Sequence, residues 1–428
     1  MWKSLCGEAR SRTRPLRDLM LLSSPRYDVA VYCPLAAGFL RPGEGRTAGA
    51  ERQMVLLARE LGRRGFRVAL VVNRIGGAPS GEETGLTLVE RVERGPTKGV
   101  GALVEATRVL RSLMASDARV LVVSTGTPVV GFIALYCRLR RRRLVFASAN
   151  DLDFDLGRSD PTHPGDWERR RWLYRIGIRL VDAVVVLSRT QVALARSAFP
   201  SLKESKVVFI PYFAEEFSSD AELPAPTAFV WAGRLAEQKR PLLYPELAES
   251  LPSGSFTMIP LVPPSASAQD EARLEELTER AGALSNLTLL GTLPHAALQE
   301  CLARAVALVS TSSVEGWPNT YLEAWSHGVP VLTLLCDPDG VISERGLGAA
   351  ANGSWEAFVE AARDLWDNRH DRAELAQRTR AYIREVHSFD AVGARWEQLL
   401  ADLGIRRKNA ATGASRSHSH SFGRFSLR

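Results

Sequence analysis

Cysteine is scarce in this sequence, with five residues in 428. The cysteines are odd in number, widely scattered and form no CxxC pair: Cys6, Cys33, Cys137, Cys301 and Cys336. This usage argues against a disulfide framework and a structural zinc site, and it predicts a reducing, cytoplasmic compartment. Histidine is rare too, and no spacing joins His295 and His327 in a metal site. We interpret both as helix-cap or core residues.

Long apolar runs are also absent. Leu19–Leu22 is too short to be the apolar segment of a signal peptide. A longer run at 121–137 is interrupted at Ser124–Pro128, and each half is too short to cross a bilayer. We interpret it as a buried strand followed by a helix. The arginines after it, at 138 and 140–143, suit a solvated helix end or, alternatively, a peripheral patch at the inner face of a membrane.

The formal charge of +7 belongs to the two ends of the chain. Residues 1–26 carry a net +4 and residues 405–428 a net +6; subtracting these ten charges from +7 leaves −3 for residues 27–404. We therefore expect no nucleic-acid partner. Both ends have compositions typical of disordered segments. Each is interpreted as solvated, with contact to anionic lipid as the alternative.

Length and composition favour two soluble α/β domains, because 428 residues with 45% hydrophobic content can bury a core in each. Buried-strand and helix patterns alternate along residues 27–403. Strands are predicted at Tyr27–Tyr32, Val68–Val72, Leu86–Val92, Val120–Val123, Leu144–Ala147, Ala183–Leu187, Val207–Pro211, Ala228–Trp231, Phe256–Ile259, Ala305–Ser310 and Val329–Leu335. Helices are predicted at 100–114, 129–138, 167–180, 270–281, 319–326, 355–368, 371–387 and 388–403, and around Met54–Leu61.

Composition also suggests the domain limits. We predict a basic, disordered leader at 1–26, a first domain at 27–216, a linker at 217–227, a second domain at 228–387, a crossover helix at 388–404 and a basic, disordered tail at 405–428.

The stretch from Val314 to Leu334 carries the chemistry. Glu315 follows a buried strand, and Glu323 lies eight residues on, about two turns into the next helix. The loop at the end of a parallel strand opens on the ligand crevice, where helix N–H groups favour phosphate. Glu315 can accept hydrogen bonds from sugar hydroxyls and Glu323 can reach a ribose diol. The alternative is a pair of solvated glutamates.

Two cations and a glycine follow another strand. Gly233 permits a close backbone approach, and Arg234 and Lys239 bring two positive charges to the start of a helix near Pro241. A departing nucleotide diphosphate requires such charges. An ordinary basic surface loop is the other interpretation.

The segment Ser148–Asp155 alternates carboxylates. A divalent metal site of the DxD type is one interpretation. We favour the other, in which no metal is needed because helix N-termini and basic side chains hold a diphosphate.

Several of these strings resemble motifs of the retaining nucleotide-sugar glycosyltransferases of family 4. EGWPNTYLEAWSHGVPV resembles the E-x7-E segment, residues 233–239 resemble the GRL-x3-K motif, and Leu284–Pro294 resembles the NVxFLGxVP turn. Ala48–Glu51 resembles the GGxE loop with alanine at the first glycine, and Asn150-Asp151 stands where many members carry a His-Asp pair. The resemblance covers most of 27–403.

The resemblance implies a GT-B fold: α/β, with two Rossmann-like doubly wound domains facing across a cleft and a C-terminal helix crossing back to the first domain. It assigns catalysis to Glu315, Arg234 and Lys239. It assigns donor binding to Gly49, Gly233, Leu293, Gly316, Trp317, Asn319, Thr320 and Glu323. Asn150 and Asp151 would lie on the acceptor side, where asparagine cannot titrate near neutral pH. No cofactor or metal is implied.

The implied enzyme is a retaining hexosyltransferase. It would move a sugar from a nucleotide-diphosphate sugar to a glycan or lipid-linked acceptor, commonly in cell-envelope polysaccharide synthesis. In the front-face route the leaving phosphate takes the acceptor's proton. Two alternatives stay open: a nucleotide-sugar epimerase on the same fold, and a non-catalytic sugar-nucleotide-binding protein.

Overall fold

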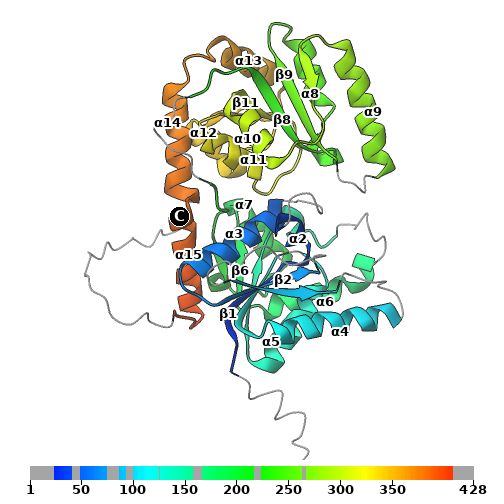
Figure 1. Cartoon of the computed structure of the whole chain (residues 1–428), viewed down its shortest axis with the longest axis vertical. Helices are drawn as coiled ribbons and strands as arrows, with labels where there is room; N and C mark the ends of the chain where they lie inside the picture. Colours follow the sequence, from blue (N-terminus) through cyan, green and yellow to red (C-terminus); the bar gives the residue numbers. More distant parts are fainter. Residues whose placement is uncertain are drawn as a thin grey trace, which may run out of the picture.

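The protein folds into two α/β domains stacked along the long axis of the molecule (Figure 1). The computed structural model describes residues 24–40, 49–74, 86–92, 100–124, 126–157, 166–215, 223–262 and 267–407. Most of the predicted leader and tail and half of the predicted linker lie outside these residues. The domain limits expected from the sequence stay predictions.

The first domain contains a parallel sheet of seven strands in the order β3-β2-β1-β4-β5-β6-β7. Its strands are β1 (Tyr27–Tyr32), β2 (Val68–Asn73), β3 (Leu86–Arg91), β4 (Ala118–Ser124), β5 (Arg143–Ala147), β6 (Ala183–Val186) and β7 (Val207–Phe209). Its helices are η1 (Pro34–Ala36), α2 (Ala37–Leu40), α3 (Gly49–Arg63), α4 (Val100–Ala115), α5 (Val129–Arg140), η2 (Asp151–Phe154), α6 (Asp166–Leu180), α7 (Arg189–Ala198) and η3 (Glu204–Lys206). The central strands are runs of buried valine, leucine and alanine, as expected for a sheet covered on both faces.

The second domain contains a parallel sheet of six strands in the order β10-β9-β8-β11-β12-β13. Its strands are β8 (Ala228–Arg234), β9 (Phe256–Leu261), β10 (Leu287–Leu289), β11 (Ala305–Ser310), β12 (Val331–Thr333) and β13 (Gly348–Ala350). Its helices are η4 (Glu237–Lys239), α8 (Leu243–Ser250), α9 (Ala268–Ala283), α10 (His295–Ala303), α11 (Asn319–Ser326), η5 (Pro338–Gly340), α12 (Val341–Arg345), α13 (Trp355–Asp367) and α14 (Ala373–Tyr382).

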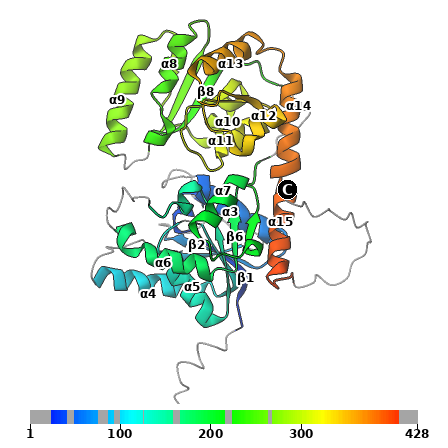
Figure 2. The ribbon, with the colours of Figure 1, turned by 180° about the vertical axis from the view of Figure 1, so that it is seen from behind.

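The last helix returns to the first domain, as the resemblance implied. A π-helical turn, Ile383–His387, joins α14 to α15 (Phe389–Asp402), and the two helices run along one side of both domains (Figure 2). Trp396 and Leu400 of α15 share a core cluster with Leu57 and Leu61 of α3. The crossover helix therefore completes the hydrophobic core of the first domain.

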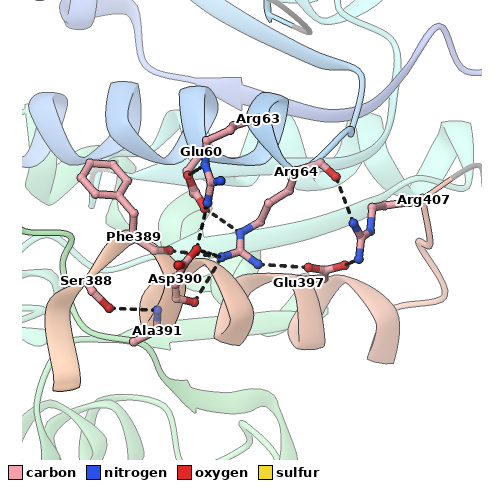
Figure 3. A network of polar contacts seen from close by, with 9 residues as sticks. All are labelled: Glu60, Arg63, Arg64, Ser388, Phe389, Asp390, Ala391, Glu397 and Arg407. Carbon is pink, nitrogen blue, oxygen red and sulfur yellow. Dashed lines mark hydrogen bonds and ion pairs between the residues drawn. The ribbon is translucent and has the colours of Figure 1, made fainter. Parts of the chain in front are cut away.

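A buried carboxylate fixes this docking (Figure 3). Glu60 of α3 is 2% exposed and accepts hydrogen bonds from Arg63 at 2.7 Å and Arg64 at 2.6 Å. Arg64 reaches on to Glu397 of α15 at 3.2 Å. A Cβ atom on Gly393 would lie 2.4 Å from the Arg64 guanidinium, so a larger residue where α15 crosses this network would displace Arg64 and Glu60.

In both sheets the carboxyl ends of the strands point toward the region between the two domains. In an open parallel sheet the ligand crevice lies where the strand order reverses, outside the carboxyl ends of the strands. The reversal falls between β1 and β4 in the first sheet and between β8 and β11 in the second. Figure 1 shows α3 and α7 of the lower domain opposite α11 of the upper domain. Among the described helices, none is long and apolar enough to span a membrane.

Candidate functional site between the two domains

Lys239 and Glu315 meet at the reversal point of the second sheet. Lys239 ends the short helix after β8, and Glu315 lies in the loop after β11. Their side chains form an ion pair, with 22% and 14% of each side chain exposed. Ser312 donates a second hydrogen bond to Glu315 at 2.6 Å. The sequence predicted both residues, and the fold brings them together.

Backbone contacts hold these two loops against each other. Ser313 donates its backbone N–H to the Gln238 carbonyl at 2.7 Å, and the Thr311 hydroxyl donates to the Lys239 carbonyl at 2.7 Å. Arg240, at a positive φ of 43°, donates to the Thr311 carbonyl at 2.7 Å. The ion pair is therefore positioned by structure within the second domain alone.

Glu323 lies one turn into α11, which corrects the expectation of two turns. Pro318 is the N-cap and the helix begins at Asn319. Half of the eight-residue spacing between Glu315 and Glu323 is therefore loop. Arg52 of α3 donates a hydrogen bond to Glu323 across the domain boundary. Burial raises the pKa of Glu323, and the positive charges of Arg52 and His295 oppose that rise. Arg52 also contacts Glu215 at 3.0 Å.

The starts of α3 and α11 touch. Gln53 donates to Asn319 at 2.7 Å and to the Phe213 carbonyl at 2.9 Å. A Cβ atom on Gly49 would lie 2.0 Å from the Asn319 amide nitrogen, so the approach of the two helices needs glycine there. Two helix N-termini, each with positive dipole character, therefore face the same narrow space.

That space is small in this structure. The cavity lined by Arg52, Asn319 and Glu323 has a volume of about 10 Å³. A site for a drug-sized ligand needs several hundred Å³. A nucleotide therefore does not fit this cavity in the arrangement that the structure shows.

Glu51 is a buried acid with one carboxylate oxygen left without a hydrogen-bond partner among the described residues. It is 9% exposed, and its Oε2 atom has no hydrogen-bond partner among the described residues. Burial raises the pKa of Glu51; a backbone hydrogen bond to its carboxylate and the charge of Arg234, from the other domain, oppose that rise. Arg234 ends β8 and is exposed, and it lies near enough to Glu51 of the first domain for its charge to act on that carboxyl group.

The acidic segment after β5 is built as a structural turn. Asp153 is 3% exposed and accepts hydrogen bonds from the backbone N–H groups of Ala149 at 2.7 Å and Gly126 at 3.1 Å. Both carboxylate oxygens of Asp153 thus accept hydrogen bonds from the backbone. In the part of the chain that the structure describes, no three histidine, cysteine or acidic residues gather as a metal site.

Asp151 faces the cleft with a different set of contacts. Gln191 of α7 donates to it at 3.0 Å. Burial raises the pKa of Asp151; the Gln191 hydrogen bond opposes the rise, while the charges of Asp153, Asp339 and Glu315 add to it. Asp151 therefore lies close to acids of both domains.

Two further contacts join the domains beside Asp151. A Cβ atom on Gly316 would lie 2.8 Å from the Cα of Asn150. Asp339, at a positive φ of 55°, accepts hydrogen bonds from the backbone N–H groups of Arg189 at 2.8 Å and Thr190 at 3.3 Å, at the start of α7. An acid from the second domain thus caps a helix of the first.

The remaining expected donor-binding residues lie around this centre. Trp317 is 6% exposed and its ring lies 5.4 Å from that of His387, so its side chain belongs to the core beside the crossover. Leu293 lies in the loop before α10 and Thr320 in the first turn of α11. At Gly233 a Cβ atom would meet only the Trp231 ring, at 3.5 Å, which is an ordinary contact.

Four contact residues were not predicted: Arg52, Gln53, Gln191 and Asp339. Arg52 and Gln53 directly follow the Ala48–Glu51 string. Their position at the start of a helix beside that motif could have identified them. No local sequence pattern identifies Gln191 and Asp339, because their partners come from distant parts of the chain.

Two family models divide the chain between them. The model described as Glycosyltransferase Family 4 matches residues 47–214, and the model described as Glycosyl transferases group 1 matches residues 215–385. Among curated proteins, glycosyltransferase 1 domain-containing protein 1 of Xenopus tropicalis is 23% identical over 146 residues. That match spans 34% of this chain and 40% of the relative.

Solved structures match nearly the whole chain in fold. Sucrose-phosphate synthase from Thermosynechococcus elongatus has a TM-score of 0.72 at 16% identity and covers 89% of this chain and 99% of its own. WaaG, a glycosyltransferase involved in lipopolysaccharide biosynthesis, has a TM-score of 0.63 at 16% identity, covering 88% and 99%. Anabaena HepE has a TM-score of 0.63 at 15% identity, covering 88% and 100%.

The motifs, the two facing sheets and the two family matches agree. The chain belongs to the family 4, group 1 glycosyltransferases, enzymes of the GT-B fold that transfer a sugar from a nucleotide-sugar donor.

Proposed function

We propose that this chain is a retaining, metal-independent hexosyltransferase that transfers a sugar from a UDP-sugar to a glycan or glycolipid acceptor. The observation that carries the proposal is the Lys239–Glu315 ion pair at the strand-order reversal of the second sheet, facing the first domain. Anabaena HepE has been solved with UDP and with UDP-glucose, which supports UDP as the nucleotide. WaaG, involved in lipopolysaccharide biosynthesis, supports a role in cell-envelope synthesis. We propose that this role is cytoplasmic, as the cysteine usage predicts.

Arg234 and Lys239 would stabilise the leaving diphosphate. As the glycosidic bond breaks, negative charge develops on the phosphate oxygen, and fixed positive charges lower the energy of that state. The N-terminus of α11 adds its own N–H groups. Gly233, in the same loop, would let the phosphate approach the backbone. These groups supply the neutralisation that a metal ion gives in other glycosyltransferases.

Glu315 would position the donor sugar. Its ion pair with Lys239 holds the carboxylate beside the diphosphate site, where it can accept hydrogen bonds from sugar hydroxyls. In the front-face route the anomeric carbon–phosphate bond breaks and the bond to the acceptor oxygen forms on the same face. The acceptor's proton passes to the leaving phosphate oxygen, so no separate base is required.

Glu323 would bind the ribose, in competition with Arg52. The carboxylate already accepts a hydrogen bond from Arg52, and the cavity beside it is too small for a nucleotide. Donor binding therefore exchanges the Arg52 contact for ribose hydroxyls and separates the starts of α3 and α11. Asn319 lines this cavity, and Gly49 and Thr320 lie at the starts of the same two helices.

The acceptor would bind on the first-domain side of Gly316. Asp151 lies there with Gln191, and its raised pKa suits a carboxyl group that exchanges hydrogen bonds with an acceptor hydroxyl. Asn150 provides a neutral amide where a titrating histidine is common in the family. The backbone of Leu293 and Trp317 would contact the nucleobase and the sugar.

Turnover of UDP-sugars tests the proposal. A panel of UDP-hexoses is incubated with glycan and glycolipid acceptors, with and without EDTA, and products are identified by mass spectrometry. The proposal expects a product whose anomeric configuration matches that of the donor and whose yield is unchanged by EDTA. Inversion of configuration, loss of activity in EDTA, or an epimerised donor formed without acceptor would contradict it.

A further inference from the structure

The outward faces of α5 and α6 carry large apolar side chains. Leu135 and Leu139 of α5 are 54% and 66% exposed, and Trp172 and Ile176 of α6 are 58% and 40% exposed. The opposite faces of both helices belong to the core of the first domain, where Ile133 and Tyr174 are fully buried. The exposed residues are therefore not needed to fill that core.

The two helices lie in backbone contact. A Cβ atom on Gly131 would lie 2.1 Å from the Leu173 carbonyl oxygen, and one on Gly177 would lie 2.7 Å from the Gly131 nitrogen. Helices this close present their outward residues on one continuous surface. We name it the α5–α6 surface.

The polar members of this surface are almost all arginines. Its exposed positions, counted from the described side chains of α5, its C-cap and α6, are Leu135, Arg138, Leu139, Arg141, Glu168, Arg169, Arg171, Trp172, Arg175, Ile176 and Arg179. Six arginines thus accompany four large apolar residues and one acid. Because residues 27–404 as a whole carry a net −3, this local positive charge is a departure from the rest of the body.

We propose that the α5–α6 surface binds the face of a bilayer that contains anionic phospholipid. An interfacial helix inserts tryptophan, leucine and isoleucine at the boundary of head groups and acyl chains, while basic residues pair with phosphates. Arginine extends its apolar stem along such a boundary and keeps its charged end at the head groups. Each basic residue near an anionic surface contributes about 1 kcal/mol.

The surface adjoins the acceptor side of the cleft. Arg171 donates to the Leu156 carbonyl at 3.4 Å, which ties α6 to the turn that carries Asp151. Leu152, within that turn, is 46% exposed. A bilayer bound at α5–α6 would present a lipid-linked acceptor to Asp151; this consequence rests on the proposed function, whereas the lipid binding does not.

Vesicle sedimentation tests the inference without any donor or acceptor. The full chain is mixed with vesicles of phosphatidylcholine alone or with about 30% phosphatidylglycerol, a composition that gives the anionic surface potential the argument needs. We expect binding to the anionic vesicles only, weakened by salt. Arg175→Glu/Arg179→Glu and Leu135→Ser/Trp172→Ser should each lower the bound fraction at least about tenfold.

Matched controls separate this surface from general charge and apolarity. Arg363→Glu/Arg384→Glu makes the same charge change on exposed residues of the second domain, and Val92→Ser/Leu335→Ser removes two other exposed apolar side chains. Both should bind like wild type.

Three results would overturn the inference. Equal binding by all variants would place the lipid contact in the basic ends of the chain. No binding by wild type would remove the lipid contact altogether. A dimer in solution that Leu135→Ser/Trp172→Ser dissociates would assign the surface to a second copy. Because vesicle binding needs no nucleotide, each result is independent of donor turnover.

Discussion

The two domains contribute to the site in different ways. In the second domain, Lys239, Glu315 and Ser312 hold one another within a single sheet-end framework. In the first domain, Arg52 and Gln53 form hydrogen bonds to Glu323 and Asn319 of the second domain. Asp151 accepts a hydrogen bond from Gln191 of α7, which is distant in sequence. The Lys239–Glu315 pair is therefore held within one domain, whereas the contacts of Arg52 and Gln53 with Glu323 and Asn319 depend on how the two domains are placed.

The largest effect should follow from breaking the donor-side pair. Lys239→Ala removes a positive charge from the leaving diphosphate and should lower kcat by about 10²–10³-fold. The control Lys203→Ala removes an exposed lysine of the first domain and should retain full activity. Steady-state kinetics and a denaturation curve measure both. An equal loss of kcat in Lys239→Ala and Lys203→Ala would contradict the placement of the diphosphate site in the second domain.

The connection between the domains should be sensitive to acid. Burial lowers the pKa of His387 to about 4, and the ring contacts the Tyr212 carbonyl at 2.8 Å. A histidine with a depressed pKa contributes stability above its unfolded pKa of about 6.5, and that stability is lost as pH falls toward 4. We expect the free energy of unfolding to fall by roughly 2–3 kcal/mol over this window.

Substitution of the histidine checks that assignment. His387→Gln should reduce the pH dependence of unfolding between pH 6.5 and 4, while His370→Gln, at an exposed position, should leave it unchanged. Urea denaturation at several pH values measures both. An unaltered slope in His387→Gln would place the acid sensitivity elsewhere.

The crossover helix offers a third comparison. Gly393→Ala would press a methyl group into the Glu60–Arg64 network and should destabilise the protein by about 1–3 kcal/mol. Gly282→Ala is the matched control, because nothing lies within 4 Å of its Cβ position in α9. That change should stabilise by up to about 1 kcal/mol. Thermal unfolding of the two variants should therefore shift in opposite directions.

The smallest effect tests the cross-domain contact itself. Arg52→Gln frees Glu323 from its partner, so donor ribose no longer competes with the guanidinium. We expect the Kd for the nucleotide donor to fall three- to tenfold, about 1 kcal/mol. Arg52→Lys keeps a positive charge and should bind nearly as wild type does. Weaker donor binding by Arg52→Gln would show that Arg52 holds the donor and does not compete with it.

Much of the fold and the donor side could be predicted from the sequence. Buried apolar runs and the punctuation by Pro318 and Gly328 set β11, α11 and β12 because these are local signals. The position of Glu323 within α11 was misjudged because the spacing counts residues through a loop as well as a helix.

The acceptor side was less predictable for physical reasons. Alternating acids at 151–155 left a metal site open as the less favoured interpretation, and the sequence did not show that a 3-10 turn directs Asp153 to backbone N–H groups. The capping of α7 by Asp339 requires both domains in place. Contacts of this kind depend on tertiary geometry, which short sequence patterns do not encode.

Donor binding tests the central claim most directly. Thermal unfolding is measured for wild type and Glu323→Ala with UDP, GDP and ADP, each with and without EDTA. We expect UDP to stabilise wild type by roughly 3 kcal/mol at a hundredfold excess over its Kd, unchanged by EDTA, and to stabilise Glu323→Ala much less. The absence of a shift with every nucleotide, or a shift that EDTA abolishes, would contradict the account.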